Sequence, residues 1–119
     1  MQYEYFYGAQ AEQFSFYRIP KALFTEPNFR ELSTDAKVLY GILLDRMSLS
    51  LKNQWLDAQN KVYIIFTVEE IMDALNCANQ KATRLMVELE KQAGLIERKR
   101  QGLGRPNLIY VKNLRSNDK

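Results

Sequence analysis

Two helical patterns separated by three residues constrain this fold more than any other feature of the sequence. Thr67, followed three positions later by Glu70, forms a capping-box pattern that predicts a short helix ending at Leu75. Asn76-Cys77-Ala78 fits a turn, and apolar side chains then recur at helical spacing over residues 79–93. A short helix, a tight turn and a longer helix predict a helix-turn-helix.

The longer of these helices has two distinct faces. Turning about 100° per residue from Ala82 places small and apolar side chains on one side, namely Ala78, Leu85, Met86, Leu89 and Ala93. The opposite side carries Gln80, Arg84, Val87 and Lys91, flanked by Thr83 on one edge and by Lys81 and Glu88 on the other. Amide, guanidinium, hydroxyl and methyl groups read base edges in a DNA major groove, although any amphipathic helix exposes some of them.

A basic hairpin is predicted directly after this helix. Gly94 ends the helical pattern, and residues 96–114, "IERKRQGLGRPNLIYVKNL", have strand-like runs on both sides of Gly102 and Gly104. A helix-turn-helix followed by a two-stranded hairpin is typical of a winged helix. The predicted fold class is therefore α+β, a winged helix-turn-helix with an N-terminal aromatic arm or strand.

Positive charge is concentrated in the last third of the chain. Residues 77–119 carry ten basic and four acidic side chains, whereas residues 1–76 carry seven basic and ten acidic ones. No acid interrupts the basic groups between Arg98 and Asn117. Such a segment attracts a polyanion, but charge alone is equally consistent with a solubilising surface.

The alternation of a strand divides the wing cations between two faces. Arg98 and Arg100 fall on one face, and Glu97 and Lys99 on the other, so they cannot all touch DNA at once. Arg105, at the predicted tip, has little core to pack against and is the best-placed phosphate contact.

The preceding part of the chain supplies the rest of the domain. Pro27 predicts a turn or short helix, and Ser33 is the expected N-cap of a long helix. Residues 48–60 fit a frayed helix end and a loop, and residues 61–67, "KVYIIFT", fit a buried strand. The long helix has one apolar face, made by Ala36, Leu39, Tyr40, Leu43 and Met47.

Residues 1–17 form an aromatic arm. They hold seven of the fourteen aromatic side chains, which is more apolar surface than a floppy terminus leaves in water. Residues 14–17 fit a short strand, and the alternation before them suggests that two arms pair by edge addition in an oligomer. The alternative is that the arm folds back on its own core. The candidate oligomerisation residues are Tyr3, Tyr5, Phe6 and Tyr7.

Composition restricts the function classes. The chain has 119 residues, 46% of them hydrophobic, enough for one cored domain. With no histidine and only Cys77, it lacks the usual zinc ligands and histidine-based nucleophile systems, so we expect no catalytic residues, no metal, no cofactor and no enzyme activity. Cys77 fits the core. No apolar stretch of membrane-spanning length and no secretory leader is evident, which predicts a cytoplasmic protein without a membrane partner.

Three segments resemble the N-terminal domain of RepA-type plasmid replication initiators of Gram-positive bacteria. They are "FYRIPKALF", "LSTDAKVLYGILLDRMSLSLKN" and the stretch from "VYIIFTVEE" to "RPNLIYV". The resemblance implies a winged helix that binds double-stranded DNA at repeated sites of a plasmid origin, as a homodimer or higher oligomer. It also implies a separate C-terminal domain, resembling DnaD, that engages host replication proteins. Residues 18–114 would be the DNA-binding domain, and residues 115–119 the start of a linker.

The resemblance also assigns roles to individual residues. The recognition-helix set would be Asn79, Gln80, Lys81, Thr83 and Arg84, and the wing contacts would be Lys99, Arg100 and Arg105. One departure is Ala78, where many helix-turn-helix proteins have a capping serine, so Asn76 or Asn79 is an alternative cap.

Two other functions fit the same fold. The winged helix would serve as a protein-interaction module if the basic wing were only solvated surface, or as a transcriptional repressor if DNA binding had another purpose. Salt dependence separates the first from a DNA-binding initiator, because phosphate contacts weaken log-linearly with salt and an apolar interface does not.

Overall fold

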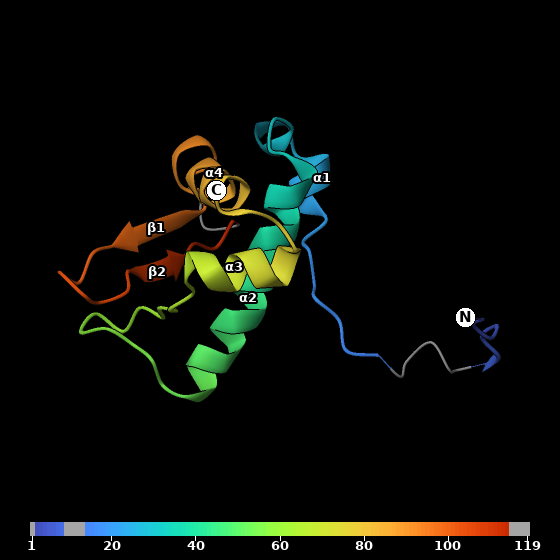
Figure 1. The fold of residues 1–119 in the computed structure, drawn as a ribbon, viewed down its shortest axis with the longest axis horizontal. Helices are drawn as coiled ribbons and strands as arrows, with labels where there is room; N and C mark the ends of the chain where they lie inside the picture. The colour runs from blue at the N-terminus through green and yellow to red at the C-terminus, as the bar shows by residue number, and fades with distance from the viewer. Residues whose placement is uncertain (1, 9–13, 115–119) are drawn as a thin grey trace.

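The computed structural model describes residues 2–8 and 14–114. Its elements, in chain order, are α1 (Ala22–Thr25), the 3₁₀ turn η2 (Pro27–Phe29), α2 (Thr34–Lys52), α3 (Val68–Leu75), α4 (Asn79–Val87), the π-helical turn η3 (Glu88–Gln92), β1 (Ile96–Lys99) and β2 (Leu108–Val111). Figure 1 shows α2, α3 and α4 packed together, with the hairpin projecting to one side. This is the predicted winged helix-turn-helix, so the fold class is confirmed.

Side-chain caps start two of the three main helices. Ser33 Oγ accepts the N–H of Ala36 at 3.1 Å, and the long helix continues to Lys52 rather than fraying from residue 48. At α3, Thr67 Oγ1 accepts the Glu70 N–H at 3.2 Å while Glu70 accepts the Thr67 N–H at 2.9 Å. The capping box therefore forms as predicted.

The turn between α3 and α4 differs from the expected one in its capping. Asn76 adopts a left-handed backbone, with φ of 52°, and ends α3 instead of starting α4. Ala78 is the N-cap of α4 and has no side-chain cap hydrogen bond, so the alternatives of Asn76 and Asn79 are wrong. The extended backbone of Ala78 directs the chain into α4 without a side-chain acceptor. Because that residue precedes the first helical turn, it is exposed and does not join the core.

The wing is a two-stranded antiparallel hairpin in which Ile96 pairs with Val111 and Lys99 with Leu108. Gly102 and Gly104 have φ values of 118° and 78°, a backbone that L side chains rarely adopt, which explains the glycines at the tip. Ile64 adds a single bridge to Ile109.

The strand predicted over residues 61–67 is largely absent. Only Ile64 pairs with the wing, through two hydrogen bonds of 2.9 Å to Ile109. The neighbouring backbone pairs with its own loop instead, because Val62 bridges Leu56 and the Tyr63 N–H donates to Trp55 O at 3.2 Å. Burial at Ile64 and Phe66 explains why the sequence pattern resembled a strand.

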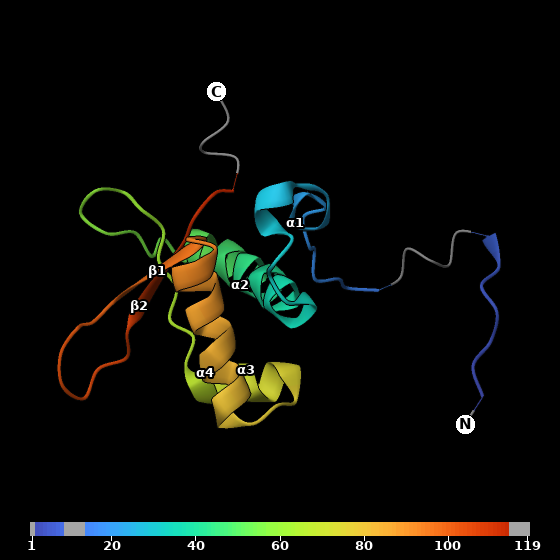
Figure 2. The same ribbon diagram turned by 90° about the horizontal axis from the view of Figure 1, so that it is seen from above.

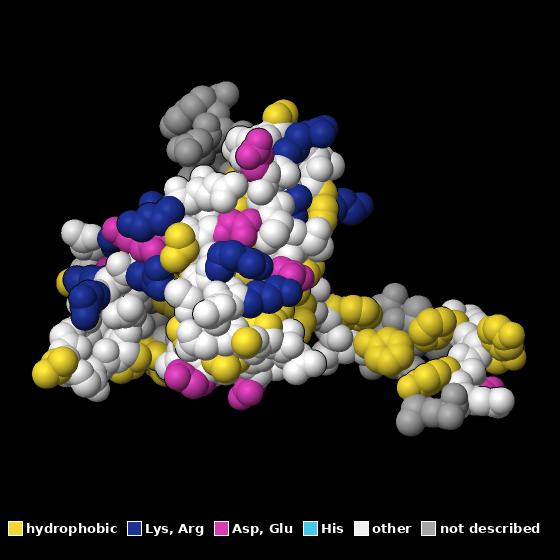
Figure 3. Space-filling model, turned by 45° about the horizontal axis from the view of Figure 1, so that its top comes forward, with side chains coloured by type: hydrophobic (Ala, Val, Ile, Leu, Met, Phe, Trp, Pro, Cys, Tyr) yellow, Lys and Arg dark blue, Asp and Glu magenta, His cyan; other side chains and the backbone are white. Residues whose placement is uncertain are grey.

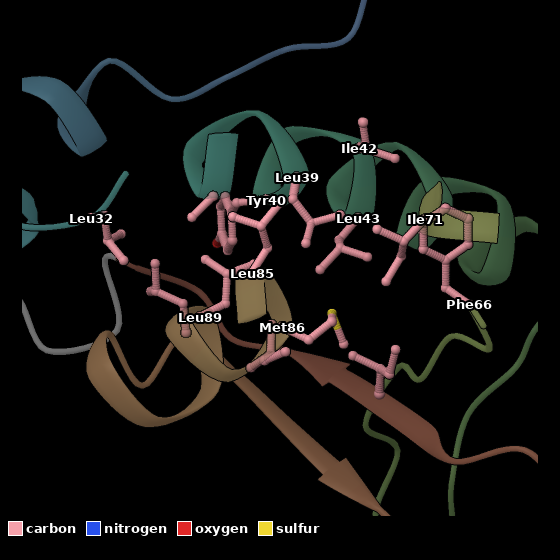
Figure 4. Close-up of a cluster of buried hydrophobic side chains, with 14 of the residues drawn as sticks. Leu32, Leu39, Tyr40, Ile42, Leu43, Phe66, Ile71, Leu85, Met86 and Leu89 are labelled. Carbon is pink, nitrogen blue, oxygen red and sulfur yellow. The ribbon is translucent and has the colours of Figure 1, made fainter. Parts of the chain in front are cut away.

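The core lies where α2, α4 and the hairpin meet (Figure 4). Leu39 and Leu43 from α2 meet Leu85 from α4 and Leu89 from η3, and all four are fully buried. The Tyr40 hydroxyl donates to Lys112 O at 2.7 Å, and burial raises the pKa of this phenol. α4 is thereby fixed by its apolar face, as its periodicity predicted.

The arm extends away from residues 18–114, which we call the body (Figure 2). No strand forms in residues 2–8 or 14–17, so the predicted strand there is wrong. Residues 2–8 lie away from the core in Figure 2, whereas Phe16 and Tyr17 line hollows beside α2. Its rings contact one another, with Phe6 and Phe14 edge to face at 6.1 Å. The radius of gyration is 16.2 Å, against about 13.5 Å for a compact chain of this length. The remaining arm residues and the predicted linker, 115–119, are outside the described residues.

Within residues 2–8 and 14–114, no helix has the length and apolar character needed to cross a membrane.

Candidate nucleic-acid interface

α4 presents a polar face because its opposite face is locked into the core. Ala82, Leu85 and Met86 are at most 2% exposed. Gln80, Arg84, Val87 and Lys91 point the other way and are exposed, as the helical spacing predicted. The outward face is thus held in a fixed orientation by core packing.

Four of the five predicted recognition residues lie together at the start of α4. Asn79, Gln80, Thr83 and Arg84 are exposed within the first two turns, and Thr83 Oγ1 lies 3.5 Å from Asn79 Oδ1. Gln80 and Arg84 are four residues apart and therefore lie on the same side. Arg84 makes no ion pair with any described residue, and the Gln80 amide is uncharged. Both side chains are available to a ligand.

Lys81, the fifth predicted recognition residue, forms an ion pair within the protein. Its Nζ lies 2.6 Å from Asp35 Oδ2 in the first turn of α2, and both side chains are partly exposed. Nothing in the sequence pattern predicts that Asp35 lies next to α4. An acid therefore borders the candidate interface.

The wing cations separate into two groups. Lys99, Arg100 and Arg105 are exposed, and none forms an ion pair in the described part of the chain. Arg98 instead faces inward, and its Nη2 and Nε lie 2.7 and 3.0 Å from Glu90 Oε1. The strand alternation predicted that the cations divide, and packing decides which of them turns inward.

The π-helical turn η3 was not predicted and holds two acids against other elements. Glu88 accepts hydrogen bonds from the Ser33 N–H and, at 3.0 Å, from the Ser33 hydroxyl, which ties η3 to the start of α2. The Arg98 guanidinium hydrogen-bonds Glu90 and holds the pKa of that carboxyl below its ordinary value. η3 thus fixes the end of α4 to both α2 and the wing.

Figure 3 compares the body with the arm. Lys and Arg side chains gather over the body, while hydrophobic side chains cover the arm. The four predicted oligomerisation residues are all strongly exposed, with Tyr3 at 84% and Tyr5 at 82%. In the described residues, no three His, Cys, Asp or Glu side chains come together in a way that would hold a metal ion.

These features define a winged helix-turn-helix domain, in which a wing flanks the polar face of the second helix of the motif. Residues 15–119 match the family model described as the N-terminus of replication initiator protein A, RepA. The chain belongs to this family, as its sequence resemblance predicted.

A curated relative and three solved structures are similar to this chain. A 41 kDa protein of Lactobacillus helveticus is 32% identical over 92 residues, which cover 77% of this chain and 26% of that protein. The chain therefore spans about a quarter of the length of the curated relative it matches.

The solved structures match over nearly the whole chain. One, described as the N-terminal domain of a DNA-binding protein, has a TM-score of 0.76 at 39% identity, covering 94% of this chain and 85% of the other. A second, described as a Rep–DNA complex, has the same score and identity, with 92% and 84% covered. A third, an MDR initiator, has a TM-score of 0.73 at 40% identity, with 92% and 86% covered.

Proposed function

We propose that this domain binds double-stranded DNA sequence-specifically at repeated sites of a plasmid origin and thereby initiates replication. One observation carries the proposal: the fixed outward face of α4, with Gln80 and Arg84 side by side, is flanked by a wing whose exposed cations have no acidic partner in the described residues. Membership of the replication-initiator family and similarity to a protein described in complex with DNA support it.

In this proposal α4 lies in the major groove. Gln80 has the amide geometry for a bidentate contact to adenine, and Arg84 the fork geometry for guanine, while Asn79 and Thr83 line the same entrance. Lys99, Arg100 and Arg105 reach phosphate, which positions the domain without specifying sequence. Lys81 joins them only when it leaves Asp35.

Repeated sites imply more than one domain per origin. We propose that the arm, through Tyr3, Tyr5, Phe6 and Tyr7, joins two copies into a homodimer or higher oligomer, so that two recognition helices meet two half-sites. The domain itself is proposed to have no enzymatic activity and to act in the cytoplasm. In a full-length initiator, a further C-terminal domain would engage host replication proteins.

Footprinting on DNA from the cognate plasmid origin tests the proposal. We expect protection of short repeated sequences, with log affinity falling linearly as log salt rises, by about 0.9 per phosphate contacted. Equal affinity for origin DNA and for random DNA would contradict sequence-specific binding. A domain that does not bind DNA, and whose association with a protein is independent of salt, would favour the protein-interaction module. Protection confined to a promoter would favour a repressor.

A further inference from the structure

An open groove lies at the end of β2 opposite to the wing tip. Its volume is about 780 Å³, within the range of sites that hold a small ligand or a few side chains. α2 forms one wall and the end of β2 the other. The lining is mainly apolar and aromatic, from Tyr40, Leu44, Met47, Val62, Tyr110 and Leu114.

The groove walls are braced and do not need an occupant to form. The Tyr40 hydroxyl joins α2 to Lys112 O at 2.7 Å, and the Tyr110 hydroxyl donates to Asp57 Oδ2 at 3.0 Å. Asp57 also accepts the N–H groups of Gln59 and Lys61, which fixes the loop above the groove. A preformed apolar groove favours an occupant with rigid apolar side chains, because less ordering entropy is lost.

The same chain carries a segment of that chemistry. Tyr5 and Phe6 are 82% and 60% exposed. The arm extends away from the rest of the chain in Figure 2, and hydrophobic side chains gather on it in Figure 3. An aromatic side chain buries about 150–250 Å², so four arm rings approach the roughly 800 Å² per partner of a stable interface. The arm therefore has enough apolar surface to hold two copies together.

The arm leaves the body at the edge of this groove. Pro20 lines the groove, and the adjacent residues are fixed against α2, where a Cβ on Gly41 would lie 2.8 Å from Ile19 Cγ1. In a two-fold dimer the same patch meets itself. Two grooves that face each other would thus bring each arm root beside the other copy's groove. Pro20 lies fifteen positions after Tyr5, a reach of up to roughly 50 Å when extended.

Charge at the groove is complementary to the arm. Lys61 and Lys112 stand at the groove with Glu97, and Lys61 Nζ lies 5.0 Å from the centre of the Tyr110 ring. Residues 2–17 contain Glu4 and a second glutamate but no Lys or Arg. An acidic aromatic segment beside lysines and a tyrosine face gains both ion pairing and apolar burial.

We propose that this groove receives the aromatic arm of a second copy, with Tyr5 and Phe6 as the inserted side chains. The inference rests on the arm-mediated dimer proposed above and names the surface that receives the arm. Since the groove lies at the far end of β2 from Arg105, an exchanged arm leaves α4 and the wing tip free for DNA. In Figure 2 the end of β2 leads away from α3, which supports this separation.

A photo-crosslinking residue at position 5, in a mixture of light and isotope-heavy copies of Met1–Lys119, tests the proposal. We expect mixed light–heavy crosslinks from position 5 to peptides around Met47, Lys61–Val62 and Tyr110–Leu114. Crosslinks only within one copy would place the arm in its own groove and overturn the exchange. Mixed crosslinks to any other surface would show that the groove is not the surface that receives the arm.

A matched pair of variants gives an independent readout. Met47→Arg fills and charges the groove, whereas Leu51→Arg places the same side chain on the same helix at an exposed position that does not line it. By sedimentation we expect Met47→Arg to weaken self-association at least ten-fold and Leu51→Arg to leave it unchanged. Circular dichroism and affinity for a single DNA half-site check that both variants remain folded. Equal dimerisation of the two folded variants would contradict the proposal.

Failure of the groove and failure of the proposed function give different results. If the arm dimerises elsewhere, deleting residues 1–13 abolishes the dimer while Met47→Arg does not, and DNA binding to one half-site persists in both. If the domain does not bind DNA, footprinting fails whatever the crosslinks show. A protein that is monomeric at every concentration tested would overturn both the arm-mediated dimer and the groove.

Discussion

The body and the arm are both rich in apolar side chains, yet they use them in opposite ways. In the body, Leu85 and Leu89 are fully buried because their helical spacing brings them against the face of α2. In the arm, Tyr3 and Tyr5 are more than four-fifths exposed. The difference shows that apolar content stabilises a chain only where its spacing matches a second surface.

The comparison has a functional consequence. The body is held together within one chain, so its polar outward face is fixed before any ligand arrives. The four rings at the start of the arm stay largely exposed in the described chain, and we expect their contribution to arise only when copies associate. Stability and single-site DNA binding should therefore belong to the body, and concentration-dependent behaviour to the arm.

The largest effect should follow a core truncation in the body. Leu85→Ala removes a fully buried side chain and should lower the free energy of unfolding by about 2–5 kcal/mol. Tyr5→Ala, in the arm, should change it by less than about 0.5 kcal/mol at concentrations where the protein is monomeric. Urea denaturation followed by circular dichroism measures both. Comparable losses in the two variants would show that the arm belongs to the folded core.

Base reading by the body should be the next largest effect. Arg84→Ala removes an exposed guanidinium from α4 and should weaken specific binding by about 1–3 kcal/mol while relaxing preference at one base position. Lys91→Ala, an exposed cation on the same side of the helix but in η3, is the control. Fluorescence anisotropy on specific and random duplexes measures the change. An equal loss on both would make Arg84 a phosphate contact.

Much of the body could be predicted because its signals are local. The capping box at Thr67, the glycines of the wing tip and the apolar face around Ala82 each depend on residues within a few positions of one another. The outward positions of Gln80 and Arg84 followed from the same periodicity.

What the sequence did not reveal depends on contacts between distant segments. Asp35 meets Lys81, and Glu90 turns Arg98 inward, only because packing brings α2, η3 and the wing together. The same holds for residues 61–67, whose composition fits a strand although most of their backbone pairs with the preceding loop. Strand composition reports burial, and the choice of partner is a tertiary property.

The wing should position the body without adding specificity. Arg105→Ala should lower affinity roughly five- to ten-fold near 0.1 M salt on every sequence and reduce the salt slope by about one. Lys52→Ala, an exposed cation at the far end of α2, should change neither quantity. Anisotropy titrations across a salt series measure the slope. An unchanged slope for Arg105→Ala would move the phosphate contact to another residue.

Arg98, the wing cation that faces inward, should affect the stability of the fold more than it affects the affinity for DNA. The Arg98 guanidinium lowers the pKa of Glu90 in the folded state, so this pair stabilises the protein above the carboxyl's ordinary pKa and loses its contribution as pH falls through the lowered value. Arg98→Met should cost about 1 kcal/mol at pH 7, and this cost should shrink as pH falls below the ordinary range of a glutamate carboxyl. Urea denaturation across this pH range measures it. A cost that is independent of pH would assign the effect to packing of the Arg98 stem.

The smallest effect should come from the acid that borders the recognition helix. Asp35→Asn releases Lys81, whose ammonium lies 2.6 Å from the carboxylate, and should strengthen DNA binding by about 0.2–1 kcal/mol at low salt, since the pair is exposed and screened. Removing any acid near DNA also raises the local potential, so affinity alone does not identify the cause.

A double-mutant cycle with Lys81→Ala separates the two causes. If Asp35 acts by holding Lys81, neutralising it should strengthen binding only where Lys81 is present. If it acts through its field, the gain should be the same in both backgrounds. Asp45→Asn, at an exposed acid on the same helix that takes no part in the ion pairs described above, controls for net charge. A coupling of zero would show that Asp35 does not act by holding Lys81. If Lys81→Ala alone also left the affinity unchanged, the recognition set would reduce to Asn79, Gln80, Thr83 and Arg84.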